Sequence, residues 1–256
     1  MMNNIIINAD DFGISKEVNN AIMTVMDSQL CMDTTLLANF EDTEDAANLA
    51  ISINRMNHVG IHLNITEGTP LTKNIRNESR FCNTEGMFHN RKLGRIALLS
   101  KSEQKAIYEE LKSQVQLCRK FGISISHADS HNHIHEEPGM LPILLRVLKD
   151  EKIPYLRLSN DIGKTSLHNK LYRNTYNYIL KLKRLTATNH FGSISDFLNS
   201  KNTFTPGSVI ELMIHPGKTE ADQILDVYSK ENLSLLLPKV LTYNKLVSYN
   251  QLSYKV

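Results

Sequence analysis

The sequence contains few cysteines and no tryptophan. Its three cysteines (Cys31, Cys82 and Cys118) are odd in number and lie far apart along the chain. They form neither a Cys-x-x-Cys pair nor a disulfide framework, so we expect no cysteine-ligated metal. Unpaired cysteines also suit a reducing compartment, and we therefore expect a cytoplasmic protein.

Long apolar runs and a strong excess of one charge are also missing. The first apolar run, Ile5–Ile7, is followed almost at once by Asp10 and Asp11, and it is too short for a signal peptide or a membrane span. The formal net charge is only +2, and the cationic residues form no stripe. Neither nucleic acid nor a membrane is therefore an expected partner. With no internal repeat and no interdomain linker, residues 1–256 are expected to form one domain.

Strand-like and helix-like patterns alternate along the chain. Strands are expected at 5–7, 34–38, 58–63, 155–158, 209–214 and 245–249, and helices at 16–28, 43–56, 102–121, 139–150 and 166–188. Residues 66–95 lack clear periodicity, and we expect a functional loop or lid there. Repeated β-then-α order implies parallel strands with right-handed crossovers, which predicts an incomplete (β/α) barrel, with an open doubly wound sheet as the alternative.

The segment 127–135 carries four histidines and one aspartate at alternate positions. These residues are His127, Asp129, His131, His133 and His135. In an extended backbone, side chains alternate between faces, so all five groups would project to one side. Neutral imidazole and carboxylate are the usual ligands of zinc and related metals, and the segment therefore predicts a metal centre or an acid–base site.

Other reactive side chains lie at or just after expected strand ends. Asp10 and Asp11 follow the first strand, His62 ends the third, and His215 follows the strand at 209–214. Because the carboxyl ends of parallel strands gather on one face of such a fold, these residues are expected to share one site with the histidine segment. Adjacent carboxylates can divide the work there: one binds a cation and the other accepts a proton from water.

Four blocks of the sequence resemble the signature blocks of the YdjC-like carbohydrate deacetylases, a family that includes the chitooligosaccharide deacetylases. The blocks are NADDFG at 8–13, GIHLNITEG at 60–68, SHADSHNHIH at 126–135 and ELMIHPG at 211–217, in the family's order. The resemblance implies a single-domain distorted (β/α) barrel of the polysaccharide-deacetylase type. It also implies a metal-dependent hydrolase that removes N-acetyl groups from an acetylated sugar or a short chitooligosaccharide.

The same resemblance assigns roles to individual residues and names partners. Asp11, His62 and His131 are expected to hold one divalent metal, with Asp10 as the general base and His215 as a candidate general acid. The groups expected to contact substrate or to support the site are His127, Asp129, His133 and Arg157. Two imidazoles and a carboxylate suit zinc, although family members are often described with magnesium, so both metals stay open. The family also suggests a homodimer.

Two other functions stay open at this stage. A metal-dependent phosphoesterase also gathers histidine and aspartate at barrel strand ends, although the sequence has no glycine-rich phosphate loop. A sugar-binding relative without catalytic activity is the other alternative, and the presence of both Asp10 and His215 speaks against it. Because the chain has no tryptophan, a tyrosine, a phenylalanine or the Met87–Phe88 loop would have to stack on a bound sugar.

Overall fold

The computed structural model describes residues 2–89, 97–200 and 204–252. The strands are β1 (Asn4–Phe12), β2 (Asp33–Leu36), β3 (Val59–Leu63), β4 (Ala128–Ser130), β5 (His190–Ser193), β6 (Val209–Ile214), β7 (Pro216–Lys218), β8 (Ile224–Asp226) and β9 (Lys245–Leu246). The α-helices are α1 (Lys16–Asp27), α2 (Thr43–Ser52), α3 (Lys73–Arg76), α4 (Lys101–Lys120), α5 (Leu141–Asp150), α6 (Leu167–Leu182), α7 (Ile194–Asn199) and α8 (Leu233–Leu241). The short 3₁₀ helices are η1 (Met56–His58), η2 (His131–Glu136) and η3 (Tyr249–Gln251).

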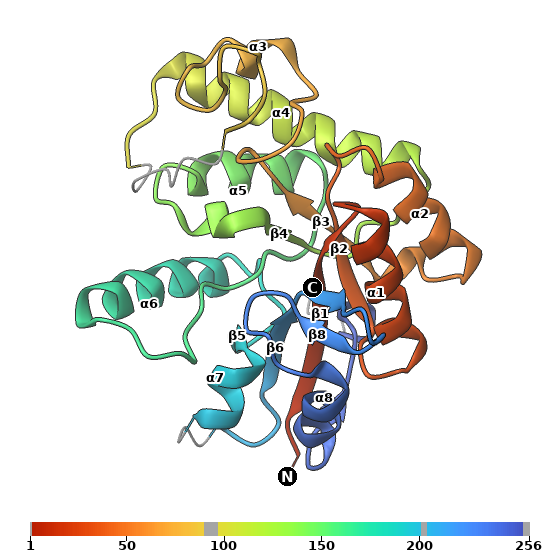
Figure 1. Ribbon diagram of the computed structural model, residues 1–256. Coiled ribbons are helices and arrows are strands. Elements are labelled where there is room, and N and C mark those ends of the chain that lie inside the picture. Colours follow the sequence, from red (N-terminus) through yellow and green to blue (C-terminus); the bar gives the residue numbers. More distant parts are fainter. Residues whose placement is uncertain (1, 90–96, 201–203, 253–256) are drawn as a thin grey trace.

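A curled parallel sheet in the order β4-β3-β2-β1-β6-β5 forms the centre of the molecule, and β9 pairs with the start of β1. Helices surround this sheet, with α1 and α2 beside β1 and β2, and α4 and α5 beside β3 and β4 (Figure 1). Ile5 and Ile7 pack in the main core, whereas Ile6 packs with Tyr155 and Tyr249 in a second cluster. The apolar run of β1 is therefore buried on both faces, as is typical of a parallel strand covered by helices.

The segment after α5 links the two edges of the sheet. The backbone N–H of Ala128 in β4 donates to Tyr155 O (2.9 Å), and the N–H of Arg157 returns a bond to Ala128 O (2.9 Å). A few residues later, the N–H of Asp161 donates to Phe191 O in β5 (3.1 Å). The expected strand at 155–158 is thus reduced to a single bridge with β4. The incomplete (β/α) barrel is confirmed, and the doubly wound alternative is wrong.

Helix boundaries follow the capping residues of the sequence. Ser15 accepts a hydrogen bond from the N–H of Val18 at the start of α1, and Ser100 forms a capping box with Glu103 at the start of α4. Gly122, which directly follows the last turn of α4, has a φ of 84°. This left-handed conformation is the one in which glycine commonly ends a helix. The expected helices at 16–28 and 102–121 are therefore confirmed.

The loop or lid expected at 66–95 lies only partly within the described residues, which stop at residue 89 before resuming at 97. Its described part is anchored to α4, because the buried Glu110 carboxylate accepts hydrogen bonds from the N–H groups of Leu71 (3.0 Å) and Thr72 (2.8 Å). Phe88 is buried there and forms a bridge with Cys82. A gating role for this segment stays a prediction.

Three elements near the C-terminal end were not expected from the sequence. These are β5, α7 and the antiparallel hairpin β7–β8, which follows directly after β6. Strands of three or four residues are too short to produce a clear alternation in the sequence. Within the part of the chain that the structure describes, no helix combines the length and apolar character needed to span a bilayer.

Candidate active site

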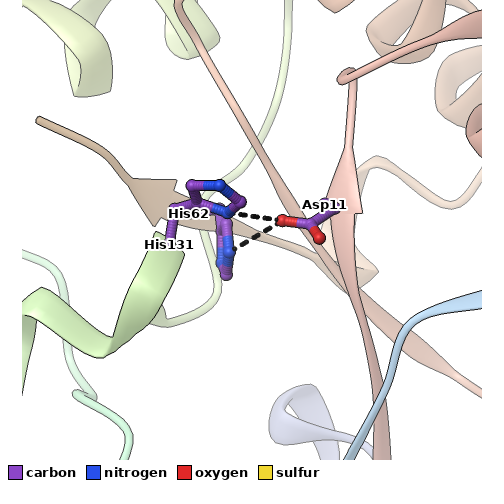
Figure 2. Close-up of side chains that lie close together, drawn as sticks. All are labelled: Asp11, His62 and His131. Atoms are coloured by element: carbon purple, nitrogen blue, oxygen red, sulfur yellow. Dashed lines mark hydrogen bonds and ion pairs between the residues drawn. The ribbon is translucent and has the colours of Figure 1, made fainter. Parts of the chain in front are cut away.

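Asp11, His62 and His131 bring one carboxylate and two imidazoles together at the carboxyl ends of β1, β3 and β4 (Figure 2). Asp11 Oδ1 lies 3.2 Å from His62 Nε2 and 2.7 Å from His131 Nδ1. All three side chains are buried, and their ligand-type atoms lie within 4.8 Å of one another. Burial opposes ionisation of Asp11, but the hydrogen bonds of His131 and His62 outweigh it and hold its pKa well below the usual range.

A β-bulge places two consecutive aspartates at the same site. The pairing of β1 with β2 runs from Ala9–Thr34 to Phe12–Leu36, so two residues of β1 lie opposite one residue of β2. Asp11 at this bulge has a φ of 70°. In a regular strand Asp10 and Asp11 would point to opposite faces of the sheet, whereas here both line one cavity.

Asp129 and Thr35 fix the orientation of the His62 ring. His62 Nδ1 lies 2.6 Å from Asp129 Oδ1, and the Thr35 hydroxyl donates to Asp129 Oδ2 (3.0 Å). Burial opposes a charge on His62, but Asp129 and Asp11 outweigh it and raise its pKa to about 10. A carboxylate behind an imidazole is the usual outer support of a metal-binding histidine, because it sets the ring orientation and increases ligand basicity.

Arg157 is fully buried and binds the carboxylates of Asp10, Asp129 and Glu211. Its two terminal nitrogens lie 2.6 and 2.7 Å from the two oxygens of Asp10, and its Nε donates to Glu211 (2.7 Å). Burial opposes ionisation of Asp10, but the guanidinium outweighs it and keeps the pKa of Asp10 lowered. Arg157 does not line the cavity, so it supports Asp10 from behind.

His215 follows β6 and begins the hairpin β7–β8. Its backbone N–H donates to Asp226 Oδ2 (2.8 Å), and its ring Nδ1 lies 3.6 Å from the same oxygen. Its Nε2 lies 3.8 Å from Asp10 Oδ2. Burial opposes a charge on the ring, but the close contact of Nδ1 with the Asp226 carboxylate and the charges of Asp10 and Asp11 outweigh it, and the pKa of His215 is raised. The ring can therefore hold a proton close to Asp10.

A cavity of about 360 Å³ opens over these side chains. Its ionisable wall consists of Asp10, Asp11, His62, His131, His133, His215, Asp226 and Glu231. Ile194, Met213, Leu233 and Tyr228 contribute apolar surface. No lysine or arginine is found among the described residues that line it.

The alternating groups of segment 127–135 were expected to share one face, and this expectation is wrong for the residues after His131. Strand β4 ends at Ser130, and Asn132 and His133 both have a φ of 53°, which turns the chain into η2. His133 still lines the cavity, and its Nδ1 is buried without a hydrogen-bond partner among the described residues. His135 instead points to Ser130, with Nδ1 2.6 Å from the hydroxyl.

His127 is fully buried behind the site and does not line the cavity. Its ring stacks on Tyr249 with centroids 3.8 Å apart, and its Nε2 lies 3.1 Å from Asn8 Oδ1. Asn8 in turn donates to Asp10 Oδ1 (2.7 Å). His127 therefore lies behind the cavity wall, and its role as a supporting residue stays a prediction.

Four residues of the site were not identified from the sequence. These are Asn8, Thr35, Glu211 and Asp226, which position Asp10, His62, Arg157 and His215 respectively. Asn8 and Glu211 lie inside two of the motif blocks. Asn8 directly follows the apolar run Ile5–Ile7 of β1, and Glu211 is the one polar residue of β6. That contrast could have identified them, because buried polar groups require partners. Thr35 and Asp226 carry no comparable signal.

Fold and site together define a barrel protein with a candidate metal centre at its strand ends. The family model described as "YdjC-like protein" matches residues 4–250. The chain therefore belongs to the YdjC-like family, and the resemblance carried by the four motif blocks is confirmed. A carbohydrate deacetylase of Clostridium beijerinckii is 30% identical over 217 residues, which is 83% of this chain and 81% of that protein. One of Brevibacillus brevis is 29% identical and covers 96% and 93%.

Solved structures share the fold at low sequence identity. A candidate cellobiose-phosphate cleavage protein of Enterococcus faecalis superposes with a TM-score of 0.73 at 18% identity, covering 99% of this chain and 100% of that chain. A CE4 family pseudoenzyme of Bacillus anthracis superposes with a TM-score of 0.51 at 8% identity, covering 98% and 65%. The expected barrel of the polysaccharide-deacetylase type is thereby confirmed.

Proposed function

We propose that this protein is a metal-dependent hydrolase that removes N-acetyl groups from an acetylated sugar or a short chitooligosaccharide. The observation that carries the proposal is the different environment of two adjacent aspartates. Asp11 faces two imidazoles, while Asp10 is held by an arginine beside a histidine whose pKa is raised. A ligand, a base and an acid therefore meet in one cavity. The deacetylase names of the relatives support the same reaction.

The donor set of Asp11, His62 and His131 fits one divalent cation. The neighbouring group of Asp10, His62 and Asp129 fits less well, because Arg157 already binds both of its carboxylates. A cation held by the first set would supply Lewis-acid polarisation of the acetamide carbonyl and a lowered pKa of bound water. Two imidazoles favour zinc over magnesium, which prefers oxygen ligands, and both are kept in the test.

Asp10 is proposed to accept the proton of the attacking water. It lines the cavity, and its paired contact with Arg157 keeps it ionised and fixes its direction. A low pKa makes Asp10 a weak base in the ground state. Its contribution to the rate would come from its fixed position beside the water and from its ionised form, which can accept a proton. General base help of this kind is typically worth about 10²–10⁴ in rate.

His215 is proposed to give its proton to the nitrogen that leaves. Asp226 and Asp10 favour the imidazolium form, and the ring lies at the same end of the cavity as Asp10. Without this proton the amine would leave as an anion, which makes cleavage of the C–N bond very slow. His133, whose pKa burial lowers, adds a neutral ring that can hydrogen-bond to substrate.

The composition of the cavity wall argues against the phosphoesterase alternative. An anionic phosphoester would meet Asp10, Asp11, Asp226 and Glu231, with no lysine or arginine among the described lining residues. Phosphate sites usually supply arginine, lysine or several metal ions for that charge. An acetylated sugar carries no net charge and is therefore the better match. The homodimer and the cytoplasmic location stay predictions.

The proposal is tested by acetate release from N,N′-diacetylchitobiose and N-acetylglucosamine, using chelator-treated protein with zinc, magnesium or no added metal. We expect metal-restored release that falls by about 10² or more in Asp10→Asn. Asp45→Asn removes an exposed carboxylate on α2 and is the matched control. Equilibrium dialysis gives an independent readout: Asp10→Asn should still bind one metal ion per chain, whereas Asp11→Ala should not.

No acetate release by folded protein that binds one metal ion would exclude these two sugars as substrates. Two or three metal ions per chain, together with hydrolysis of p-nitrophenyl phosphate, would instead favour phosphoester chemistry. Sugar binding without hydrolysis, unchanged in Asp10→Asn, would indicate the inactive sugar-binding alternative.

A further inference from the structure

A chain without tryptophan must use another side chain if it stacks an aromatic ring on a sugar. The Met87–Phe88 loop does not provide one, because Phe88 is only 6% exposed. Tyr228 is 65% exposed and lines the cavity that contains Asp10 and His215. Within the described lining of that cavity, it is the one side chain with a phenyl ring.

The turn that carries Tyr228 is fixed by the same carboxylate that positions His215. Asp226 Oδ1 accepts hydrogen bonds from the N–H groups of Tyr228 (3.0 Å) and Ser229 (2.9 Å), while Oδ2 accepts from the N–H of His215 (2.8 Å). The ring of Tyr228 stands at 88° to the imidazole of His215, with centroids 4.5 Å apart. The exposed ring is therefore held at a defined place beside the proposed general acid.

Close packing beside the hairpin β7–β8 holds this turn against His215 and Gly217. A Cβ atom at Gly217 would lie 2.4 Å from Val227 Cγ1, which is far too close for a side chain. Val227 immediately precedes Tyr228, and its N–H donates to His215 O (2.9 Å). Glycine at 217 thus permits the approach that places Tyr228 over the cavity.

The phenol of Tyr228 stays uncharged under working conditions. Burial of part of the side chain, followed by the charges of Asp11 and Glu67, raises its pKa to about 12. The side chain therefore combines an apolar ring with a hydroxyl that can donate a hydrogen bond. This combination of apolar body and polar tip suits the C–H face and hydroxyl rim of a pyranose.

We propose that Tyr228 is the platform on which a pyranose ring of the substrate packs while its acetamide group faces Asp10 and His215. This inference rests on the proposed function and adds that the site recognises the sugar ring as well as the acetyl group. Contact with the ring removes apolar surface of both partners from water, and loss of such contact typically costs about tenfold or more in affinity.

The test compares two substrates in each variant: N,N′-diacetylchitobiose, which has sugar rings, and N-acetylethanolamine, which has an acetamide but no ring. In Tyr228→Ala the ratio of kcat/KM for the sugar to kcat/KM for the ring-less substrate should fall about tenfold. Tyr228→Phe should restore most of the ratio. Tyr178→Ala is the control, because Tyr178 is also 65% exposed but lies on α6, away from the lining residues.

An equal loss for both substrates in Tyr228→Ala would overturn the platform, because it would mean that the tyrosine only supports His215. Binding of N,N′-diacetylchitobiose, measured by saturation-transfer NMR, separates this result from failure of the proposed function. Tyrosine-dependent binding without acetate release would support the platform and reject the deacetylase. Acetate release by Tyr228→Ala with an unchanged ratio of the two kcat/KM values would support the deacetylase and reject the platform.

Discussion

Arg157 and Asp10 form a two-point ion pair inside the barrel, with the two terminal guanidinium nitrogens 2.6 and 2.7 Å from the two carboxylate oxygens. Both side chains are buried, at 0% and 2% exposure. A paired contact of this kind fixes the plane of the carboxylate as well as its charge. The orientation of the proposed base is therefore set before any substrate enters.

Replacing Arg157 with lysine should destabilise the protein strongly. A lysine cannot bond to both oxygens of Asp10 and also reach Glu211, so buried carboxylates would lose their partners. We expect the free energy of unfolding to fall by about 3–5 kcal/mol in urea denaturation. The matched Arg146→Lys, which changes an exposed pair with Asp150, should change it by less than about 0.5 kcal/mol. Equal values for the two variants would contradict the role given to Arg157.

Asp226→Asn should move the alkaline limb of the pH profile for acetate release. The carboxylate raises the pKa of His215, and the amide keeps the shape of the side chain and one acceptor oxygen but removes the charge. The pKa of His215 should fall, so the protonated form needed by a general acid is lost at a lower pH. The limb of kcat/KM should therefore shift to lower pH, while Asp222→Asn, on an exposed turn of the same hairpin, should leave it in place. If the alkaline limb does not move in Asp226→Asn, the assignment of His215 as the general acid is wrong.

His127 should contribute to acid sensitivity of the fold. Burial lowers its pKa from 6.5 to about 4, so the unfolded chain takes up this proton at a higher pH than the folded chain. The part of the unfolding free energy that comes from neutral, buried His127 is fully present above about pH 6.5 and is lost as the pH falls toward 4. About 2 kcal/mol of the unfolding free energy is lost by about pH 5. The decrease in unfolding free energy between about pH 7 and 5 should be smaller in His127→Gln, because the contribution from protonation of His127 is absent. In His168→Gln, which removes an exposed histidine, the decrease should remain.

Much of the site could be predicted because parallel strands place their carboxyl ends together. That rule alone brought Asp10, His62 and His215 into one place from positions far apart in the sequence. Ser15 and Gly122 likewise marked helix ends through local backbone chemistry. Residues whose effect is local, or whose strand end is evident, were therefore placed correctly.

Residues that depend on exact register were not predictable in this way. The sequence shows Asp10 beside Asp11 but not the bulge that turns both inward, and it shows alternating histidines but not the left-handed residues Asn132 and His133 that end the alternation. Arg157 was placed near the site, yet its burial among carboxylates depends on the packing of separate strands. Pairing between distant elements carries no local signal.

The bulge in β1 has a consequence for how such a protein can change over time. A non-glycine residue at a φ of 70° is conformationally unfavourable by about 1 kcal/mol, and here that residue is Asp11. Glycine at this position, or a regular strand, would relax the backbone but would remove a carboxylate from the cavity. Relatives that keep the carboxylate in the cavity must keep the unfavourable backbone conformation at this position. Relatives that have lost the activity can replace the bulge with a regular strand. The backbone at position 11 is thus a conformational marker that could separate active from inactive members of the fold.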